Sequence, residues 1–136
     1  MKTIGITGGV GAGKSTVLAY LEKKYNAFVI QADEVGHIVM APGQECYQPV
    51  IDLFGKDVIK NDKTIDRKQV SDVVFGNELM RQSLDAIIHP AVKTYILEEI
   101  RKQRQAGCRL LVIEAALLLE EHYEEFCNNV WYIHTD

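Results

Sequence analysis

The sequence has few cysteines, and none of its apolar runs is long. Only three of the 136 residues are cysteine. They are widely spaced, so we expect reduced thiols in the cytoplasm rather than a disulfide framework or a zinc site. No apolar run has the length needed to span a bilayer, and the residues after Met1 reach a glycine too early for a signal peptide. We therefore expect a cytoplasmic protein without membrane attachment.

An excess of positive charge is also missing. The chain has 15 Lys and Arg against 19 Asp and Glu, which gives a net charge of −4. This balance argues against nucleic acid as a partner, because binding to a polyanion needs a basic surface. Internal repeats and low-complexity segments are absent from the sequence. The length suits a single compact domain over 1–136.

What the sequence does contain is a series of short apolar runs, which are typical of strands buried in a parallel sheet. They lie at 2–7, 27–30, 109–115 and 130–134. Helical spacing of apolar residues follows the first run at 14–25, and a second helix is expected at 32–40. A strand–helix alternation of this kind predicts an α/β fold, an open and mainly parallel sheet covered by helices on both faces.

The segment from about 42 to 107 contains no convincing strand and is too long for a simple crossover. We predict a helical insertion that carries the second substrate. Its expected helices are 46–54, 67–75, 78–88 and 92–105. Asn77 is expected to cap the third helix and Gly107 to end the fourth. His89 precedes a proline, which predicts a break between these last two helices. A short helix is also expected at 117–123.

The strongest motif is "GITGGVGAGKST" at 5–16, between the first strand and the first helix. Gly8, four residues and then Gly13-Lys14-Ser15 form the complete P-loop pattern. Glycines let the backbone approach an anion closely, and the amino end of the next helix attracts phosphate. We expect Lys14 on the β- and γ-phosphates of ATP and the Ser15 hydroxyl on Mg²⁺. The predicted nucleotide-binding residues are Gly8, Gly9, Gly11, Ala12, Gly13, Lys14, Ser15 and Thr16.

Three further residues are candidates for the acceptor side of the site. Asp33 follows the second strand, at the sheet edge where ligands bind in open α/β folds. It is either a general base or merely a helix cap, and the stretch alone favours neither. Glu114 ends a buried strand and either positions Mg²⁺ or water, or pairs with a surface lysine. His89 alone reads as a structural histidine.

Taken in order, the P-loop, "VIQADEVGHIV", the His-Pro pair and "LLLE" after the third strand resemble dephospho-CoA kinase. The resemblance covers the whole chain. It implies a P-loop kinase sheet of three layers, like that of nucleoside monophosphate kinases, with an inserted helical substrate-binding subdomain. It also implies transfer of the γ-phosphoryl group of ATP to the 3′-hydroxyl of dephospho-CoA, the last step of coenzyme A biosynthesis. Asp33 and Lys14 would be catalytic, while Asp33, His89 and Leu117 would bind the acceptor.

This chain departs from the family pattern at three places. Gln31 stands where the family commonly has a second acid, and Ala116 replaces a usual proline. Family members also continue into a lid that bears arginines, whereas this sequence ends at Asp136. We therefore expect a truncated core without a lid, which binds nucleotide but transfers phosphate poorly. We also expect the last strand to be an exposed edge that favours self-association.

Two other functions remain open from the sequence. The chain could be another small-molecule P-loop kinase that acts on nucleosides or nucleotides, because the P-loop is common to many such enzymes. A GTP-binding switch is a weaker alternative. Such a switch needs an Asn-Lys-x-Asp guanine motif, which is not found in these 136 residues.

Overall fold

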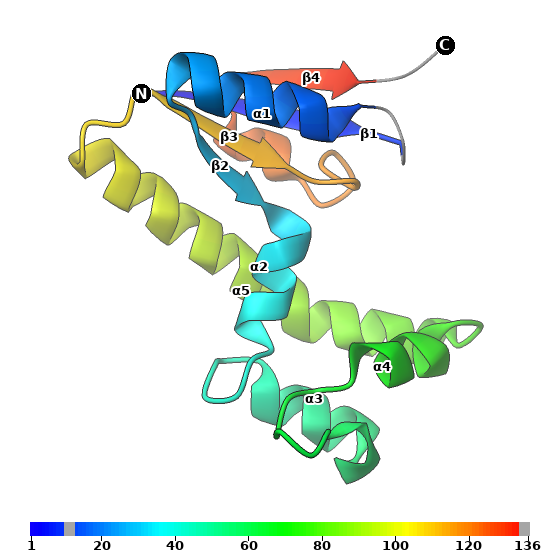
Figure 1. Cartoon of the computed structure of the whole chain (residues 1–136). Helices are drawn as coiled ribbons and strands as arrows, with labels where there is room; N and C mark the ends of the chain where they lie inside the picture. Colours follow the sequence, from blue (N-terminus) through cyan, green and yellow to red (C-terminus); the bar gives the residue numbers. More distant parts are fainter. Residues whose placement is uncertain (10–12, 134–136) are drawn as a thin grey trace. The chain divides into compact units, whose positions relative to one another are not determined.

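The computed structural model describes residues 1–9 and 13–133, which fall into two compact units (Figure 1). The sheet unit comprises Met1–Asp33 and Lys93–Asp136, and the helical unit comprises Glu34–Val92. Two helices, α2 (Ala32–Val39) and α5 (Glu78–Gln105), continue from one unit into the other. Within the described ranges, no helix has the length and apolarity needed to cross a membrane.

The sheet unit is built on four parallel strands in the order β2-β3-β1-β4. These strands are β1 (Lys2–Gly8), β2 (Phe28–Gln31), β3 (Leu110–Glu114) and β4 (Asn129–Ile133). Each lies within two residues of its predicted position. The α/β class and the parallel sheet are therefore confirmed, and β4 is the edge strand of the described sheet, as expected.

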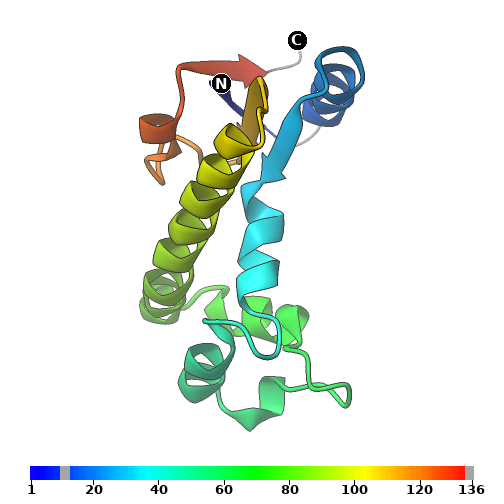
Figure 2. The same cartoon turned by 90° about the vertical axis from the view of Figure 1, so that its left-hand side faces the viewer.

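Both faces of the sheet are covered, as the alternation of elements predicted. On one face, α1 (Lys14–Tyr25) packs its buried Leu18 and Leu21 against Ile4, Ile6 and Val112. Figure 2 shows α1 on one side of the sheet and the segment around η2 (Tyr123–Phe126) on the other. A three-layer arrangement results.

The second face leaves no room for a side chain at the centre of β1. A Cβ atom at Gly5 would lie 2.9 Å from the Cys127 sulfur and 3.0 Å from a methyl carbon of Leu118. Real Cβ atoms essentially never come this close to another heavy atom. Gly5 thus permits the close packing of the segment that follows β3 against this face.

Strand β4 is attached to β1 at both of its ends. Before it, the backbone N–H of Thr3 donates to Asn128 Oδ1 over 2.8 Å, and the N–H of Asn128 donates to the Thr3 carbonyl over 2.7 Å. At its far end Gly8 lies opposite Ile133, so close that a Cβ there would be 2.1 Å from the Ile133 carbonyl oxygen. Between these points, Val130, Trp131 and Tyr132 are exposed.

The helical unit packs short helices around a small apolar core. Beyond α2 it contains α3 (Tyr47–Phe54), η1 (Lys56–Val58), α4 (Arg67–Val74) and the first part of α5. Their buried side chains include Val39, Cys46, Val50, Val70 and Val92. The helices at 46–54 and 67–75 are thus confirmed to within one residue. The only extended pairing among the described residues of this unit is a single antiparallel bridge between Ile59 and Ile65.

The predicted helix break at His89 is wrong, because α5 continues through Pro90 without interruption. A proline inside a helix removes one backbone donor and costs about 3 kcal/mol. Packing can offset such a cost, since most helix stability in proteins comes from tertiary contacts. Ala91 and Val92, directly after the proline, are both buried. The ends of α5 are as expected: Asn77 Oδ1 accepts from the N–H of Met80, and Gly107 has a φ of 85°.

The predicted helix at 117–123 is also wrong. The chain forms turns there, with backbone hydrogen bonds that mix i+3, i+4 and i+5 spacing, followed by η2. His122 adopts a left-handed conformation with φ of 61°, which ends any right-handed helix. A single helical turn is costly to nucleate, and burying Leu118 under the sheet fixes the turns instead.

Candidate active site

The candidate site lies at the carboxyl edge of the sheet, where all four parallel strands end. Glu114 is the last residue of β3, and its register partners are Ile6 on β1 and Gln31 on β2. The P-loop leaves β1 at Gly8, and α2 leaves β2 directly after Gln31. This edge is where open α/β folds place their ligands.

The described part of the P-loop has the backbone features that phosphate binding needs. Gly13 is in the left-handed region with φ of 82°, and the N–H of Val17 donates to its carbonyl to begin α1. Among the described residues no side chain caps this end of α1, and its first turn has no acidic residue. The partial positive charge at such a helix end favours an anion. Gly11 and Ala12 lie outside the described residues, so their roles stay predictions.

Lys14 and Glu114 form an ion pair across the site. Lys14 Nζ lies 3.6 Å from Glu114 Oε2, and the side chains are only 17% and 13% exposed. The sequence left open whether Glu114 pairs with a surface lysine. Its partner is instead the P-loop lysine itself. The carboxylate holds the ammonium group of Lys14 at the sheet edge.

The residues here fit a magnesium ion bound together with nucleotide phosphates. Ser15 and Thr16 are exposed in the first turn of α1, and a cleft of about 550 Å³ opens beside Ser15 and Gln31. Within the described ranges, no three His, Cys, Asp or Glu side chains group to hold a metal. Mg²⁺ seldom requires such a group, because it binds through one or two protein oxygens, substrate phosphates and water. The Ser15 hydroxyl and the Glu114 carboxylate are oxygens of this kind.

Asp33 is exposed and is the second residue of α2, directly beyond the end of β2. It therefore lies inside the helix, rather than at the residue before it where a cap belongs. The negative charge of Asp33 also acts on the buried phenol group of Tyr123, in the same unit. Burial, helped by the carboxylates of Glu121 and Asp33, raises the pKa of Tyr123 to about 12.

Tyr123 and Thr7 are two residues of this unit that sequence reasoning missed. Thr7 is buried, and its hydroxyl donates to the Ala116 carbonyl over 3.1 Å, which ties the turn after β3 to β1. The family resemblance led us to expect a proline at Ala116, and this hydrogen bond holds the turn there. Thr7 lies within the 5–16 stretch but before the P-loop pattern that begins at Gly8, and Tyr123 belongs to no motif, so only the three-dimensional packing identifies them.

Two further predicted residues, Leu117 and His89, lie in different units. Leu117 is in the turn after β3 and is 53% exposed. His89 belongs to the helical unit, where its Nε2 lies 3.6 Å from Asp85 Oδ1, one turn earlier on α5. The structure thus brings Lys14 and Glu114 together and places Asp33 beyond a neighbouring strand end. The acceptor-binding roles of Leu117 and His89 stay predictions.

Comparison with known proteins gives one consistent answer. A family model described as "Dephospho-CoA kinase" matches residues 2–136. A curated dephospho-CoA kinase from Shouchella clausii is 36% identical over 98% of this chain and 67% of its own length. One from Dehalococcoides mccartyi is 38% identical over 98% of this chain and 66% of its own length. The chain thus spans about two thirds of the length of these relatives.

Solved structures agree with the sequence matches. Dephospho-CoA kinase from Campylobacter jejuni superposes with a TM-score of 0.75 at 25% identity, over 96% of this chain and 66% of that one. A Thermus thermophilus protein superposes with a TM-score of 0.80 at 26% identity, over 98% of this chain and 65% of that one. These matches favour neither the nucleoside kinase nor the GTP switch.

Proposed function

The chain belongs to the dephospho-CoA kinase family, and from this premise we propose that it takes part in the transfer of a phosphoryl group from ATP to dephospho-CoA. The acceptor atom would be the 3′-hydroxyl oxygen of the ribose. The product would be coenzyme A, so the reaction would complete its biosynthesis. The observation that carries the proposal is the placement of a P-loop lysine, its carboxylate partner and Asp33 in one sheet unit.

In this mechanism Lys14 and the amino end of α1 bind the phosphates of ATP. Phosphoryl transfer depends mainly on position and on neutralising the charge of the transferred group. The ammonium group of Lys14 exchanges Glu114 for phosphate oxygens when the nucleotide enters. The partial positive charge of the uncapped helix end adds to this attraction.

Asp33 would act as the general base. Its carboxylate accepts the proton of the 3′-hydroxyl while the hydroxyl oxygen bonds to the γ-phosphorus. The bond from that phosphorus to the β-γ bridging oxygen breaks, and ADP leaves. Mg²⁺, when bound with ATP, supplies positive charge to the phosphate oxygens. Ser15 and Glu114 are the residues of this chain that would hold it.

The test is phosphoryl transfer to dephospho-CoA by wild type and by Asp33→Asn. Removing a general base lowers kcat by about 10²–10⁴-fold, and ATP affinity should stay within twofold because Asp33 is not in the P-loop. The matched control is Glu125→Gln, an exposed carboxylate in η2 of the same unit. Equal turnover in Asp33→Asn and wild type would mean that Asp33 has a structural role and is not the general base.

Two further properties belong to this proposal. Exposed side chains on β4 support self-association through that edge, because an unpaired strand edge is a template for another strand. We also place the protein in the cytoplasm, consistent with a reaction on soluble substrates. Sedimentation at increasing protein concentration tests the first property. A single monomeric species throughout would count against it.

A further inference from the structure

The sheet unit contains a cavity at the amino edge of its strands, which we call the amino-edge cavity. It has a volume of about 440 Å³ and lies between two chain connections, one from α1 to β2 and one from α5 to β3. Its lining combines aromatic, amide, thiol and cationic side chains, including those of Tyr25, Phe28, Gln103, Cys108 and Arg109. All of its lining residues belong to the sheet unit. A cavity of this size can hold a whole small ligand.

The amino-edge cavity is separate from the P-loop. The backbone N–H of Lys2, at the start of β1, donates to the carbonyl of the lining residue Arg109 over 2.9 Å. The P-loop leaves the other end of the same strand at Gly8. These two ends lie roughly 20 Å apart, because a strand rises about 3.3 Å per residue. A ligand in the amino-edge cavity therefore would not contact Lys14 or the phosphates of ATP.

Positive charge is concentrated around this cavity. The two segments that form its wall, 23–28 and 101–109, contain six Lys and Arg and no Asp or Glu. The sheet unit as a whole has nine Lys and Arg against ten Asp and Glu. Among the described residues that line the cavity, Arg109 is the charged one. The wall thus favours an anionic group, although the unit around it is close to neutral.

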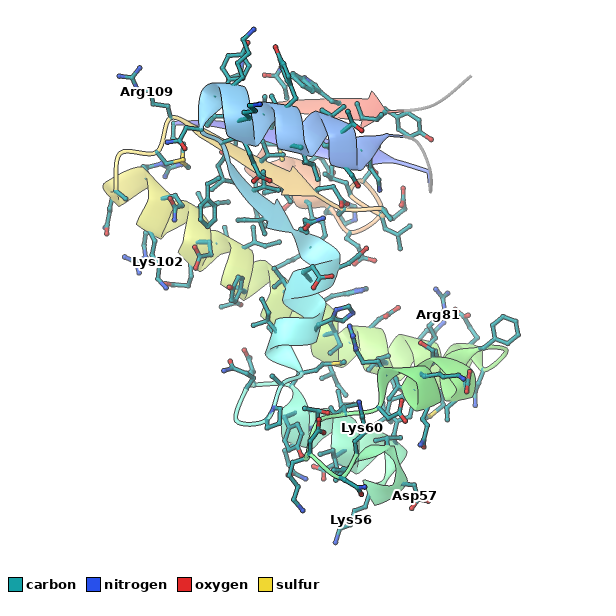
Figure 3. The ribbon with its side chains drawn as sticks, in the orientation of Figure 1. Lys56, Asp57, Lys60, Arg81, Lys102 and Arg109 are labelled. Atoms are coloured by element: carbon teal, nitrogen blue, oxygen red, sulfur yellow. The ribbon has the colours of Figure 1, made fainter. Side chains whose placement is uncertain are left out.

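Two carboxylates of α5 lie near these segments, and both pair with basic residues outside the lining. Glu98 lies 2.9 Å from Arg101, and Glu99 lies 3.8 Å from Lys102. Neither Arg101 nor Lys102 lines the cavity. Figure 3 shows Lys102 and Arg109 projecting in different directions. These two ion pairs therefore leave the positive charge of Arg109 at the rim of the cavity.

Both connections are ordered by backbone hydrogen bonds. Asn26 ends α1 in the left-handed region with φ of 53°, and its N–H donates back into that helix. At the end of α5, the N–H of Gly107 donates to the Arg104 carbonyl over 3.2 Å, and the N–H of Cys108 donates to the Gln103 carbonyl over 2.9 Å. This pair of bonds is a Schellman motif. A preformed site of this kind loses less entropy when a ligand binds.

We propose that the amino-edge cavity binds a nucleoside monophosphate, at a site distinct from the P-loop and independent of the function proposed above. The rings of Tyr25 and Phe28 form a wall on which a flat base can stack. The side-chain amides of Asn26 and Gln103 can form hydrogen bonds with the edge of a purine. The guanidinium group of Arg109 can form paired hydrogen bonds with the phosphate. A nucleoside monophosphate supplies all three groups in one small ligand.

The test is calorimetric titration of the chain with AMP. Arg109→Gln should weaken AMP binding about tenfold, because the charged donor to the phosphate is lost. Ala106→Leu should also weaken it about tenfold, because the added volume fills a lining position that is exposed at the end of α5. The matched control is Arg104→Gln, which removes an exposed arginine of the same connection outside the lining. AMP affinity should stay within twofold in this control and in Lys14→Met.

Two further measurements identify the ligand class and the place where it binds. Inorganic phosphate and benzoate should each bind about tenfold more weakly than AMP, because phosphate lacks the ring and benzoate lacks the purine edge. Saturating AMP should slow the alkylation of Cys108 by iodoacetamide, because this thiol lines the cavity. Mass spectrometry of the peptide that contains Cys108 measures the rate.

The proposal is overturned by wild-type AMP affinity in both Arg109→Gln and Ala106→Leu, or by an equal loss in Arg104→Gln. Loss of AMP binding in Lys14→Met would place AMP at the P-loop and would overturn it as well. Phosphate or benzoate binding as tight as that of AMP overturns the nucleotide class, and unchanged alkylation of Cys108 overturns the location. Thermal melting of each variant verifies folding. Phosphoryl transfer is not among these measurements, so failure of the proposed function is recognised separately.

Discussion

The two units present positive charge in different ways. In the sheet unit it comes from the amino end of α1 and a single lysine held by Glu114. In the helical unit it comes from side chains, with Lys60 and Arg67 lining one cavity. A backbone site requires fixed spacing along the chain, whereas a side-chain site can draw on scattered positions. The comparison therefore predicts different sensitivities to mutation.

The largest effect on stability is expected at Gly8, where the backbones of β1 and β4 approach each other closely. Gly8→Ala would place a Cβ atom 2.1 Å from the Ile133 carbonyl oxygen, so β1 and β4 must separate. We expect a loss of about 3 kcal/mol in the free energy of unfolding, at the upper end for overpacking. Chemical denaturation measures this loss.

Gly76→Ala is the control for Gly8→Ala. Gly76 has φ of 77° but nothing within 4 Å of the added Cβ, so only backbone strain of about 1 kcal/mol is expected. Equal losses in the two variants would show that the close approach to Ile133 costs nothing beyond strain. That result would mean that steric fit at Gly8 does not contribute to the stability of the sheet unit.

The next effect tests whether Lys14 binds ATP without contributing to the binding of dephospho-CoA. Lys14→Met removes the charged P-loop donor, and we expect ATP affinity to fall about 10- to 100-fold. Affinity for dephospho-CoA should stay within twofold. Calorimetric titration with each ligand measures both values. A parallel fall in both affinities would mean that Lys14 contributes to the binding of both ligands.

Alkaline pH should weaken the sheet unit through two buried groups. Burial is the main cause that raises the pKa of Tyr123 to about 12 and that of Cys127 to about 11. Each group has a higher pKa in the folded state than in the unfolded state, so its protonated form stabilises the fold. This contribution to the free energy of unfolding is complete below about pH 9 and is lost as pH rises toward 12. We expect Tyr123→Phe to remove about 2 kcal/mol of the loss between pH 10 and 12. Urea midpoints measured between pH 10 and 12 give this loss. An equal fall of the midpoint with pH in Tyr123→Phe and in wild type would contradict the prediction.

The smallest effect concerns Asp66, which caps α4. Asp66→Ala removes the acceptor for the backbone N–H groups of Lys68 and Gln69 at the start of α4. Losing such a cap costs about 1 kcal/mol. Chemical denaturation measures this loss, and an unchanged free energy of unfolding in Asp66→Ala would contradict the prediction.

The features that sequence predicted are those that depend on local spacing. The four strands and the start of α1 after Gly13 follow from short apolar runs and fixed glycine positions. The break at Pro90 was predicted wrongly because tertiary packing decides whether a helix tolerates proline. The pairing of Lys14 with Glu114 depends on the register of β3 beside β1, over a separation of 100 residues. The cavity of the helical unit depends on a turn that brings together positions 37, 60 and 67, a pattern that no local motif records.

The attachment of β4 has a consequence for how this strand is specified. A strand with one buried face is held in register by that face, because a slip of one residue would expose its apolar side chains. Val130, Trp131 and Tyr132 are exposed in succession, so no such face selects the register of β4. The register is set at its ends instead, by Asn128 with Thr3 and by Gly8 with Ile133. The backbone of β4 pairs with β1 along its whole length, while the contacts that fix its register lie at its two ends.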